Sequence, residues 1–518
     1  MGTTTRHGSP QAQETEPLLS GTSSVESPDA RRWKASPYWC IPVILVVNIA
    51  RGMTVSPKIA VYKEIACRAL QSTDSVWVDC NTPEVQARAS QIQASVLTLM
   101  YILSSVSTGL WSKWGDDRGR KALFSVCLFG FIGMESVFIL VSGPISAITD
   151  KAEAFILAGP ILEGLCGGLS VFNGVMHAYI ADCTPDGSRA KIFSTIQGIV
   201  FVGLALGPWS TGILSSFIPL NTYSPFYISI GLQVVLLLYV IFLLPESLRK
   251  TTTQSAPVQT TETPLSPKPI LETLKNLMTR FFAALISPIA IFRPRRVTHG
   301  TASRMDVTLT LLGFSILLYI CSTAVYPLKY LYGQHIYKWT PNQLGYYMSL
   351  LWIARATNLL VIMPFVVSYF KPKMPTNGAT SPESIALEFK FDKTLAQASL
   401  CVDALADFLI VVSPASSQTL FVLYSCMSSF TSGGNPALHS LGAVCIYALG
   451  YGSETGRLFG AIGVLNAIAH SISPTIFAMT YSLTVASHPS SIFLVAAALL
   501  FGAVMLLGRL RINLTTVV

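Results

Sequence analysis

The feature that most constrains this chain is a series of twelve apolar segments, each long enough to cross a lipid bilayer. A membrane-spanning helix needs about 20 mostly apolar residues. Because lipid offers no hydrogen-bond partners to the backbone, only helices and closed barrels cross it. Segments of helical spanning length lie at 38–60, 91–112, 122–142, 154–180, 192–217, 224–244, 308–331, 344–368, 394–413, 418–447, 456–483 and 489–508. The expected fold class is therefore an all-α integral membrane protein with about twelve transmembrane helices.

Composition supports a protein whose outer surface faces lipid. The 518 residues are 51% hydrophobic and 12% charged, whereas a soluble protein carries about 25% charged residues. The net charge of +9 does not form a compact basic patch with interleaved aromatic residues, so we expect a lipid bilayer as partner and no nucleic acid.

The spacing of the segments predicts two six-helix bundles. We expect a disordered cytoplasmic tail at 1–36, bundles at 37–245 and 308–508, a cytoplasmic linker at 246–307 and a cytoplasmic C-terminus at 509–518. Within the linker, apolar residues recur at helical spacing from 270 to 292, which predicts an amphipathic helix. This helix lies either on the membrane surface or against the underside of the bundle.

The distribution of basic residues predicts the orientation. With both termini in the cytoplasm, cytoplasmic loops hold 26 of the 35 Lys and Arg residues and outer loops hold 7. Such an excess is typical of cytoplasmic loops. In the tail, Glu14 to Leu19 resembles an acidic dileucine sorting signal, so the plasma membrane and a vacuolar or endosomal membrane both remain open.

A charged turn between the second and third apolar segments carries a family resemblance. Residues 109–121 read GLWSKWGDDRGRK, and Asp116, Gly119, Arg120 and Lys121 match the Gly-x-x-x-Asp-Arg-x-Gly-Arg-Lys signature of the major facilitator superfamily. Ser112 replaces the leading Gly, and Asp117 replaces the first Arg, beside Arg118. The resemblance implies two pseudo-symmetric bundles around one central site. It also implies a conformational latch, to which Asp182 and Arg189 would contribute.

A second match lies in the fifth segment. Gly203, Gly207, Pro208 and Gly212 resemble the Gly-x-x-x-Gly-Pro-x-x-Gly-Gly signature of antiporters in this superfamily, with Thr211 in place of one Gly. Close packing of helices is the alternative interpretation of these small residues. The fourth segment departs from the drug/proton antiporter pattern, because Pro160 occupies the position of an Arg and Glu163 that of a Gln.

Two short loops narrow the resemblance. Residues 65–68 with 80–86, and residues 391–395, resemble a fungal branch related to the tetracycline-resistance carriers and to the proton-coupled folate and thymic stromal cotransporter group. Cys67 and Cys80 flank the first loop and form a candidate disulfide if that loop lies outside the cytosol. The spacing of cysteines and histidines predicts no metal site, and we expect no cofactor.

Charged residues inside apolar segments are the candidate working groups, because a charge at the bilayer centre costs at least about 2.5 kcal/mol. Glu135 and Glu163 are the candidates for proton coupling, with structural ion pairing as the alternative. Helices one, four, seven and ten line the cavity in the family. The resemblance therefore implies substrate contacts from a set of polar residues on the first, fourth and tenth helices, namely Asn48, Arg51, Asn173, His177, Asn435 and His439.

These features predict a secondary active transporter of a small organic molecule, working by alternating access with proton-coupled efflux. A proton-coupled importer of a nutrient and a non-transporting receptor or membrane enzyme are the alternatives. No nucleophile elbow, phosphate-binding loop or metal motif indicates an enzyme. We expect a monomer with protons and a small molecule as partners.

Overall fold

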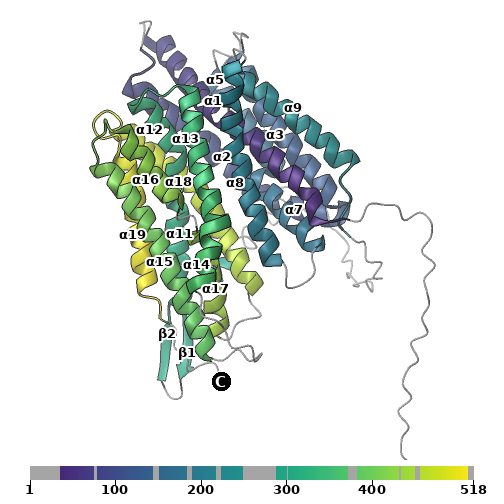
Figure 1. Cartoon of the computed structure of the whole chain (residues 1–518), viewed down its shortest axis with the longest axis vertical. Coiled ribbons are helices and arrows are strands. Elements are labelled where there is room, and N and C mark those ends of the chain that lie inside the picture. Colours follow the sequence, from purple (N-terminus) through teal and green to yellow (C-terminus); the bar gives the residue numbers. More distant parts are fainter. Residues whose placement is uncertain are drawn as a thin grey trace, which may run out of the picture. The chain divides into compact units, whose positions relative to one another are not determined.

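The structure is a computed structural model that describes residues 35–74, 79–143, 151–183, 189–217, 223–248, 287–299, 302–370, 382–430, 433–449 and 455–511. The described part is almost entirely helical (Figure 1). Most of the expected tail lies outside it, as does the expected amphipathic helix of 270–292 up to residue 286.

The described part of the first half begins with a short 3-10 turn, η1, and continues with eight helices. They are η1 (Pro37–Trp39), α1 (Cys40–Asp74), α2 (Pro83–Arg118), α3 (Arg120–Ser142), α5 (Ala152–Phe155), α6 (Ala158–Leu165), α7 (Gly168–Cys183), α8 (Arg189–Phe217) and α9 (Ser224–Phe242).

The second half follows a short turn and a hairpin. Its elements are η2 (Ser287–Phe292), β1 (Arg295–His299), β2 (Ala302–Asp306), α11 (Thr308–Ser322), α12 (Val325–Ile336), α13 (Pro341–Thr357), the π-helix η3 (Asn358–Ile362), α14 (Met363–Phe370), α15 (Pro382–Val412), α16 (Gln418–Phe430), α17 (Gly434–Ala448), α18 (Thr455–Thr484) and α19 (Ser491–Gly508).

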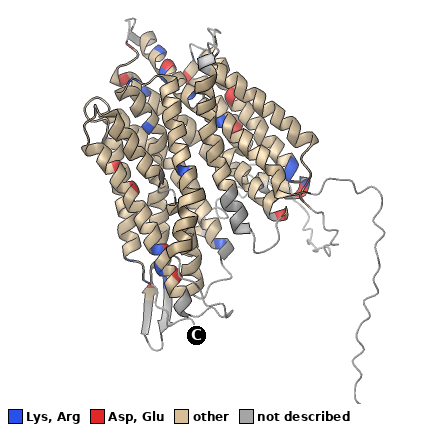
Figure 2. Ribbon diagram, viewed as in Figure 1, with Lys and Arg blue, Asp and Glu red and all other residues tan. Residues whose placement is uncertain are grey.

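These elements confirm an all-α membrane fold. Eleven helical segments of the described part are long and apolar enough to cross a membrane. The expected span at 418–447 corresponds to α16 and α17, between which residues 431–432 lie outside the described part. Charged side chains occupy few positions along the helices (Figure 2), as burial in lipid requires.

Two predicted helix ends are wrong in a way that matters for function. The first helix, expected to end at residue 60, continues to Asp74, and the seventh, expected to end at 331, continues through α12 to Ile336. Lys58 and Lys329, which lie two residues before the expected ends of these segments, therefore lie well inside the helical part of the chain. Lys329 is fully buried.

The fourth segment is not one continuous helix, as its hydropathy suggested, but a series of three. Gly167 and Gly168 adopt φ angles of +94° and +54° between α6 and α7, a conformation that glycine adopts without steric cost. Carbonyl groups at this break accept hydrogen bonds from α2: Ser104 Oγ donates to the Gly167 carbonyl oxygen over 2.6 Å and Ser107 Oγ to that of Gly164 over 2.8 Å. The break thus fixes the part of α6 that carries Glu163.

A disulfide joins Cys67, near the end of α1, to Cys80 in the loop before α2, with Cα atoms 5.3 Å apart. We call the end of the bundle that carries this bond the disulfide side, and the end that carries Gly119 the turn side. The buried residues form one large cluster that includes side chains of both halves near the disulfide side. Two further large clusters each lie within one half.

The sequence analysis missed the hairpin between the halves. Strands β1 and β2 pair antiparallel, with Arg295 opposite Asp306. Before them, Ile291 and Phe292 of η2 are buried with α11 residues such as Leu309. The short basic stretch of β1 lacks the long alternating pattern that indicates a strand.

Candidate functional site

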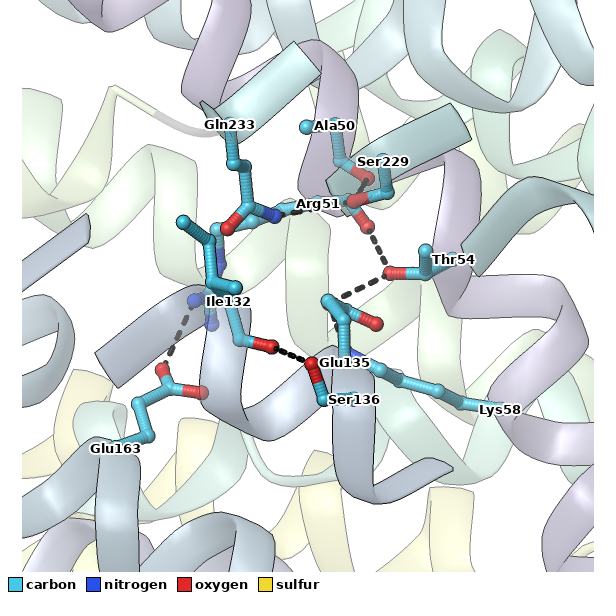
Figure 3. Close-up of polar contacts among 10 residues, drawn as sticks. All are labelled: Ala50, Arg51, Thr54, Lys58, Ile132, Glu135, Ser136, Glu163, Ser229 and Gln233. Carbon is cyan, nitrogen blue, oxygen red and sulfur yellow. Dashed lines mark hydrogen bonds and ion pairs between the residues drawn. The ribbon is translucent and has the colours of Figure 1, made fainter. Parts of the chain in front are cut away.

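Two ion pairs connect α1 to the helices that carry Glu135 and Glu163. Arg51 Nη1 donates to Glu163 Oε1 over 2.8 Å, and Lys58 Nζ donates to Glu135 Oε1 over 2.7 Å (Figure 3). The glutamate side chains are 1% and 2% exposed, whereas Arg51 and Lys58 are 21% and 16% exposed. Both acids that the sequence singled out are thus buried and paired with cations of one helix.

The cations share one face of α1 with a hydroxyl group. Arg51, Thr54 and Lys58 are three and four residues apart, a spacing that places side chains on one face of a helix. Thr54 Oγ1 lies 3.1 Å from Glu135 Oε1 and 3.1 Å from the carbonyl oxygen of Arg51. Among the described residues, Glu135 Oε2 is buried and has no hydrogen-bond partner.

Aromatic rings and α9 hold these groups in place. The guanidinium carbon of Arg51 lies 4.7 Å from the ring centre of Phe131, and Lys58 Nζ lies 5.2 Å from that of Phe138, within the range of cation–π attraction. On α9, Gln233 donates to Ser229, whose hydroxyl donates to the carbonyl oxygen of Ala50 over 3.1 Å (Figure 3). These bonds fix the backbone beside Arg51.

The other candidate substrate residues form one pair in each half. Asn173 and His177 lie one turn apart on α7, where His177 Nδ1 is 2.6 Å from the Asn173 carbonyl oxygen. Asn435 and His439 lie one turn apart on α17, where the ring centre of His439 lies 6.1 Å from that of Phe459. Asn48 is buried and donates to the carbonyl oxygen of Ile44 over 2.7 Å, so this side-chain amide braces its own helix.

The charged turn contacts the end of the sixth segment. Backbone N–H groups of Arg120 and Lys121 donate to the carboxylate of Glu246 over 2.8 and 3.1 Å. This carboxylate sits at the N-terminus of α3, where a negative charge is stabilised. Arg120 Nε also donates to Asp182 Oδ2 over 3.3 Å. The expected contact between Asp182 and the turn is therefore present.

Other parts of the expected latch cannot be placed in the same way. The side chains of Asp116 and Arg189, two residues of the expected latch, lie outside the described residues. Arg118 is exposed, and Lys121 is partly exposed. The sequence analysis missed Glu246, although a lone acid directly after an apolar segment and a proline is a usable signal.

The antiporter-type motif brings α8 close to helices of both halves. A Cβ atom at Gly207 would lie 2.7 Å from the Cα of Gly52 on α1, and one at Gly203 would lie 2.8 Å from the Cβ of Asn48. Gly212 lies against the ring of Tyr346 on α13, and Pro208 lies beside Gly345. Small residues here permit close packing of α8, as expected for such motifs.

A second charged cluster lies in the other half. Lys329 Nζ on α12 donates to Asp407 Oδ1 on α15 over 2.7 Å, with side chains 1% and 3% exposed. The guanidinium carbon of Arg355 on α13 lies 4.0 Å from the ring centre of Tyr326 and 4.8 Å from that of Trp352. The sequence analysis missed Lys329 because a lysine near an apolar segment's end resembles a loop residue.

Two hydrogen bonds and two ring contacts of the described residues also join the two halves. Ser56 Oγ donates to the carbonyl oxygen of Pro341 over 2.8 Å, and the hydroxyls of Thr98 and Thr475 are 3.2 Å apart. The rings of Tyr101 and His470 are stacked with their centres 4.8 Å apart, and those of Phe201 and Trp352 with their centres 5.6 Å apart. The first two lie toward the disulfide side, so the halves are in contact there.

Comparisons with known proteins agree with this architecture. The "MFS-type transporter avaJ" of Aspergillus versicolor is 23% identical over 93% of this chain and 91% of its own length. The "MFS efflux pump atnC" of Emericella nidulans is 22% identical over 85% and 80%. The mouse "Lysosomal proton-coupled steroid conjugate and bile acid symporter SLC46A3" is 24% identical over 80% and 79%.

Solved structures share the fold. The human organic anion transporter MFSD10 (TETRAN) superposes with a TM-score of 0.57 at 16% identity, covering 91% of this chain and 99% of the other. The nucleoside transporter NupG superposes with a TM-score of 0.55 at 13% identity, covering 91% and 99%. The family description "Major Facilitator Superfamily" matches residues 82–474. This match covers most of both bundles, and the chain belongs to the Major Facilitator Superfamily.

Proposed function

We propose that this membrane transporter moves a small organic molecule out of the cytoplasm by alternating access, coupled to protons. The observation that carries the proposal is the pair of buried glutamates, Glu135 and Glu163, each bonded to a cation of α1 that is partly exposed. Protonation of either acid would release its cation, so the ion pairs can respond to a proton gradient. We expect both termini in the cytoplasm and place the protein in the plasma membrane or a vacuolar or endosomal membrane.

The relatives support efflux more than import. Two fungal relatives are named as an efflux pump and as an MFS-type transporter, and α8 carries the antiporter-type motif with Gly207 against α1. The proposed substrate contacts are Asn48 and Arg51 with the Asn173–His177 and Asn435–His439 pairs. The proposed latch is the charged turn from Asp116 to Lys121 with Asp182 and Arg189.

The test compares cells that express the chain with matched cells that carry the Glu163→Gln variant or no copy. Untargeted measurement of small molecules inside and outside the cells should reveal a compound that is enriched outside only in cells with the unaltered chain. This compound is then loaded into proteoliposomes with a pH indicator. Export accompanied by proton movement in the opposite direction supports the proposal, and export that ignores the pH gradient contradicts the coupling.

Proton-coupled import is the second candidate, because the mouse relative is named as a proton-coupled symporter. In the same cells, an importer would enrich the compound inside rather than outside. If no compound moves and the purified protein still binds a small molecule, the receptor alternative is favoured.

A further inference from the structure

Each half contains a cluster of two buried acids and two cations within its described helices, but the pairing of the two clusters differs. In the first half, Arg51 holds Glu163 and Lys58 holds Glu135. In the second half, Lys329 holds Asp407 over 2.7 Å. The other acid and cation of this second cluster are Asp403 on α15 and Arg355 on α13.

One ion pair recurs at matching places in the two halves. Lys58 and Glu135 connect the first helix of the first half to its third helix, α3. Lys329 and Asp407 connect α12, the outer part of the first span in the second half, to α15, which is the third span of that half. Because the two halves of this fold are related by pseudo-symmetry, the recurrence marks Lys329 and Asp407 as the counterpart of a pair that we already assign to proton coupling.

The second pair of the second half is not formed. Asp403 is 5% exposed, and its Oδ1 is fully buried without a hydrogen-bond partner. Within the described part of the chain, neither Asp403 oxygen accepts a hydrogen bond or an ion pair. Arg355 makes no ion pair there either: its guanidinium lies over Tyr326 and Trp352, and its Nε is buried and unpartnered.

The free-energy cost of burying an unpaired charge determines the protonation state of Asp403. Burying an ionised carboxylate without a partner costs several kcal/mol, and in practice such a group becomes neutral. Asp407 lies one turn away on the same helix and adds a like charge. Lys329 is nearby but is bonded to Asp407. The groups that interact electrostatically with Asp403 are Asp407, Arg355, Lys329 and Tyr319.

The helices packed around α15 do not supply a further counter-ion for Asp403. On α16, Cys426 interacts with Lys329, and α19 carries no titratable side chain from Ser491 to Gly508. On α17, His439 meets Phe459 and Cys445 interacts with Asp392. Arg355 is therefore the one cation of this cluster that is near Asp403 and not already held by an acid.

We propose that Asp403 is a proton-binding residue, and that Arg355 is its exchange partner. In the conformation described here, the Asp403 carboxyl holds a proton and Arg355 rests on the two aromatic rings. In the opposite conformation, Asp403 gives this proton to water, and the carboxylate left behind is neutralised by Arg355. The inference rests on the proposed proton coupling and adds a site in the second half to it.

The protonation state is tested without knowing the substrate. The purified full chain is reconstituted in lipid nanodiscs, and infrared spectroscopy records the carbonyl stretch of protonated carboxylic acids during a pH titration. We expect a band at neutral pH that Asp403→Asn removes. The matched control is Glu163→Gln, in which the lost acid is paired with Arg51, and it should leave this band in place.

A second variant tests the role of Arg355. Arg355→Gln removes the cation that would stabilise ionised Asp403, so the pH at which the band disappears should rise by about one unit or more, a tenfold change in proton concentration. Size-exclusion profiles and thermal unfolding show whether each variant folds. If Asp403→Asn does not fold, Asp403→Glu, which should keep the band at a shifted frequency, takes its place.

Any one of three results overturns the inference. They are an infrared band that is unchanged in Asp403→Asn, a band at an unshifted frequency in a folded Asp403→Glu, and an unshifted midpoint pH of the band in Arg355→Gln. Failure of the proposed function looks different: proteoliposomes would show substrate movement without proton movement, while the infrared band would still depend on Asp403.

Discussion

Single residues in this protein are governed by the cost of charge in a medium without water. Lys329 and Asp407 are almost fully excluded from solvent and lie 2.7 Å apart. Removing one partner of such a pair leaves an uncompensated charge and costs about 3–5 kcal/mol, whereas replacing both with apolar groups is often neutral. The pair therefore makes each partner dependent on the other.

A double-mutant cycle measures this dependence. Asp407→Asn alone should lower the free energy of unfolding by about 3–5 kcal/mol, because Lys329 then lacks its counter-ion. Lys329→Met combined with Asp407→Leu should recover most of that loss. Thermal unfolding in detergent provides the measurement. Equal losses in the single and double variants would show that the two side chains do not act as a pair.

At the scale of elements, glycines decide how closely backbone segments approach. At the turn between α2 and α3, Gly119 has a φ angle of +107°, and the Glu246 carboxylate lies directly beside its Cα. Between α1 and α8, Gly207 faces the backbone of Ile49 and Gly52. In both places the missing side chain makes room for another segment.

Gly119→Ala should destabilise the turn by about 1–2 kcal/mol, because residues with a Cβ atom avoid positive φ angles. It should also displace Glu246 from the N-terminus of α3. Gly174→Ala on α7 is the matched control, since no atom lies within 4 Å of the added Cβ. Thermal unfolding of the two variants should differ clearly, and equal unfolding temperatures would contradict the contact between Gly119 and Glu246.

Gly207→Ala tests the contact between α1 and α8. Its Cβ would lie 2.5 Å from the carbonyl oxygen of Ile49, so the helices must separate, and overpacking of this kind costs about 1–3 kcal/mol. Gly231→Ala on α9, which has nothing within 4 Å of the new Cβ, should be neutral or slightly stabilising. A loss of stability of the same size in both variants would argue against close packing at Gly207.

At the scale of the whole molecule, α2 and α18 bring the two halves into contact. Thr98 and Thr475, whose hydroxyls lie 3.2 Å apart, belong to α2 and α18 in different halves. If transport requires the halves to rock, these two helices must separate in each cycle.

Paired cysteines make this motion measurable. In a variant carrying Thr98→Cys and Thr475→Cys, an oxidant should link the halves and stop transport in proteoliposomes, and a reductant should restore it. Each single substitution and the unaltered chain, treated with the same reagents, control for the native cysteines and for Cys67–Cys80. Full transport in the linked protein would exclude separation of α2 from α18.

Much of the membrane architecture follows from local sequence properties. Apolar run lengths are sufficient to predict twelve spans grouped six and six, because hydropathy is a property of neighbouring residues. The charged turn identifies the family for the same reason: Asp116 to Lys121 is a short contiguous motif. Glu135 and Glu163 could be selected because any acid within an apolar run is conspicuous.

Tertiary structure alone decided which of these charges are neutralised. The sequence indicates that Glu163 needs a partner, but only the fold brings Arg51 within 2.8 Å of it. It also placed Lys58 and Lys329 beside Glu135 and Asp407, and among the described residues it left Asp403 without a partner. The physical reason is that hydropathy is local, whereas neutralising a buried charge depends on groups that are dozens to more than a hundred residues away along the chain.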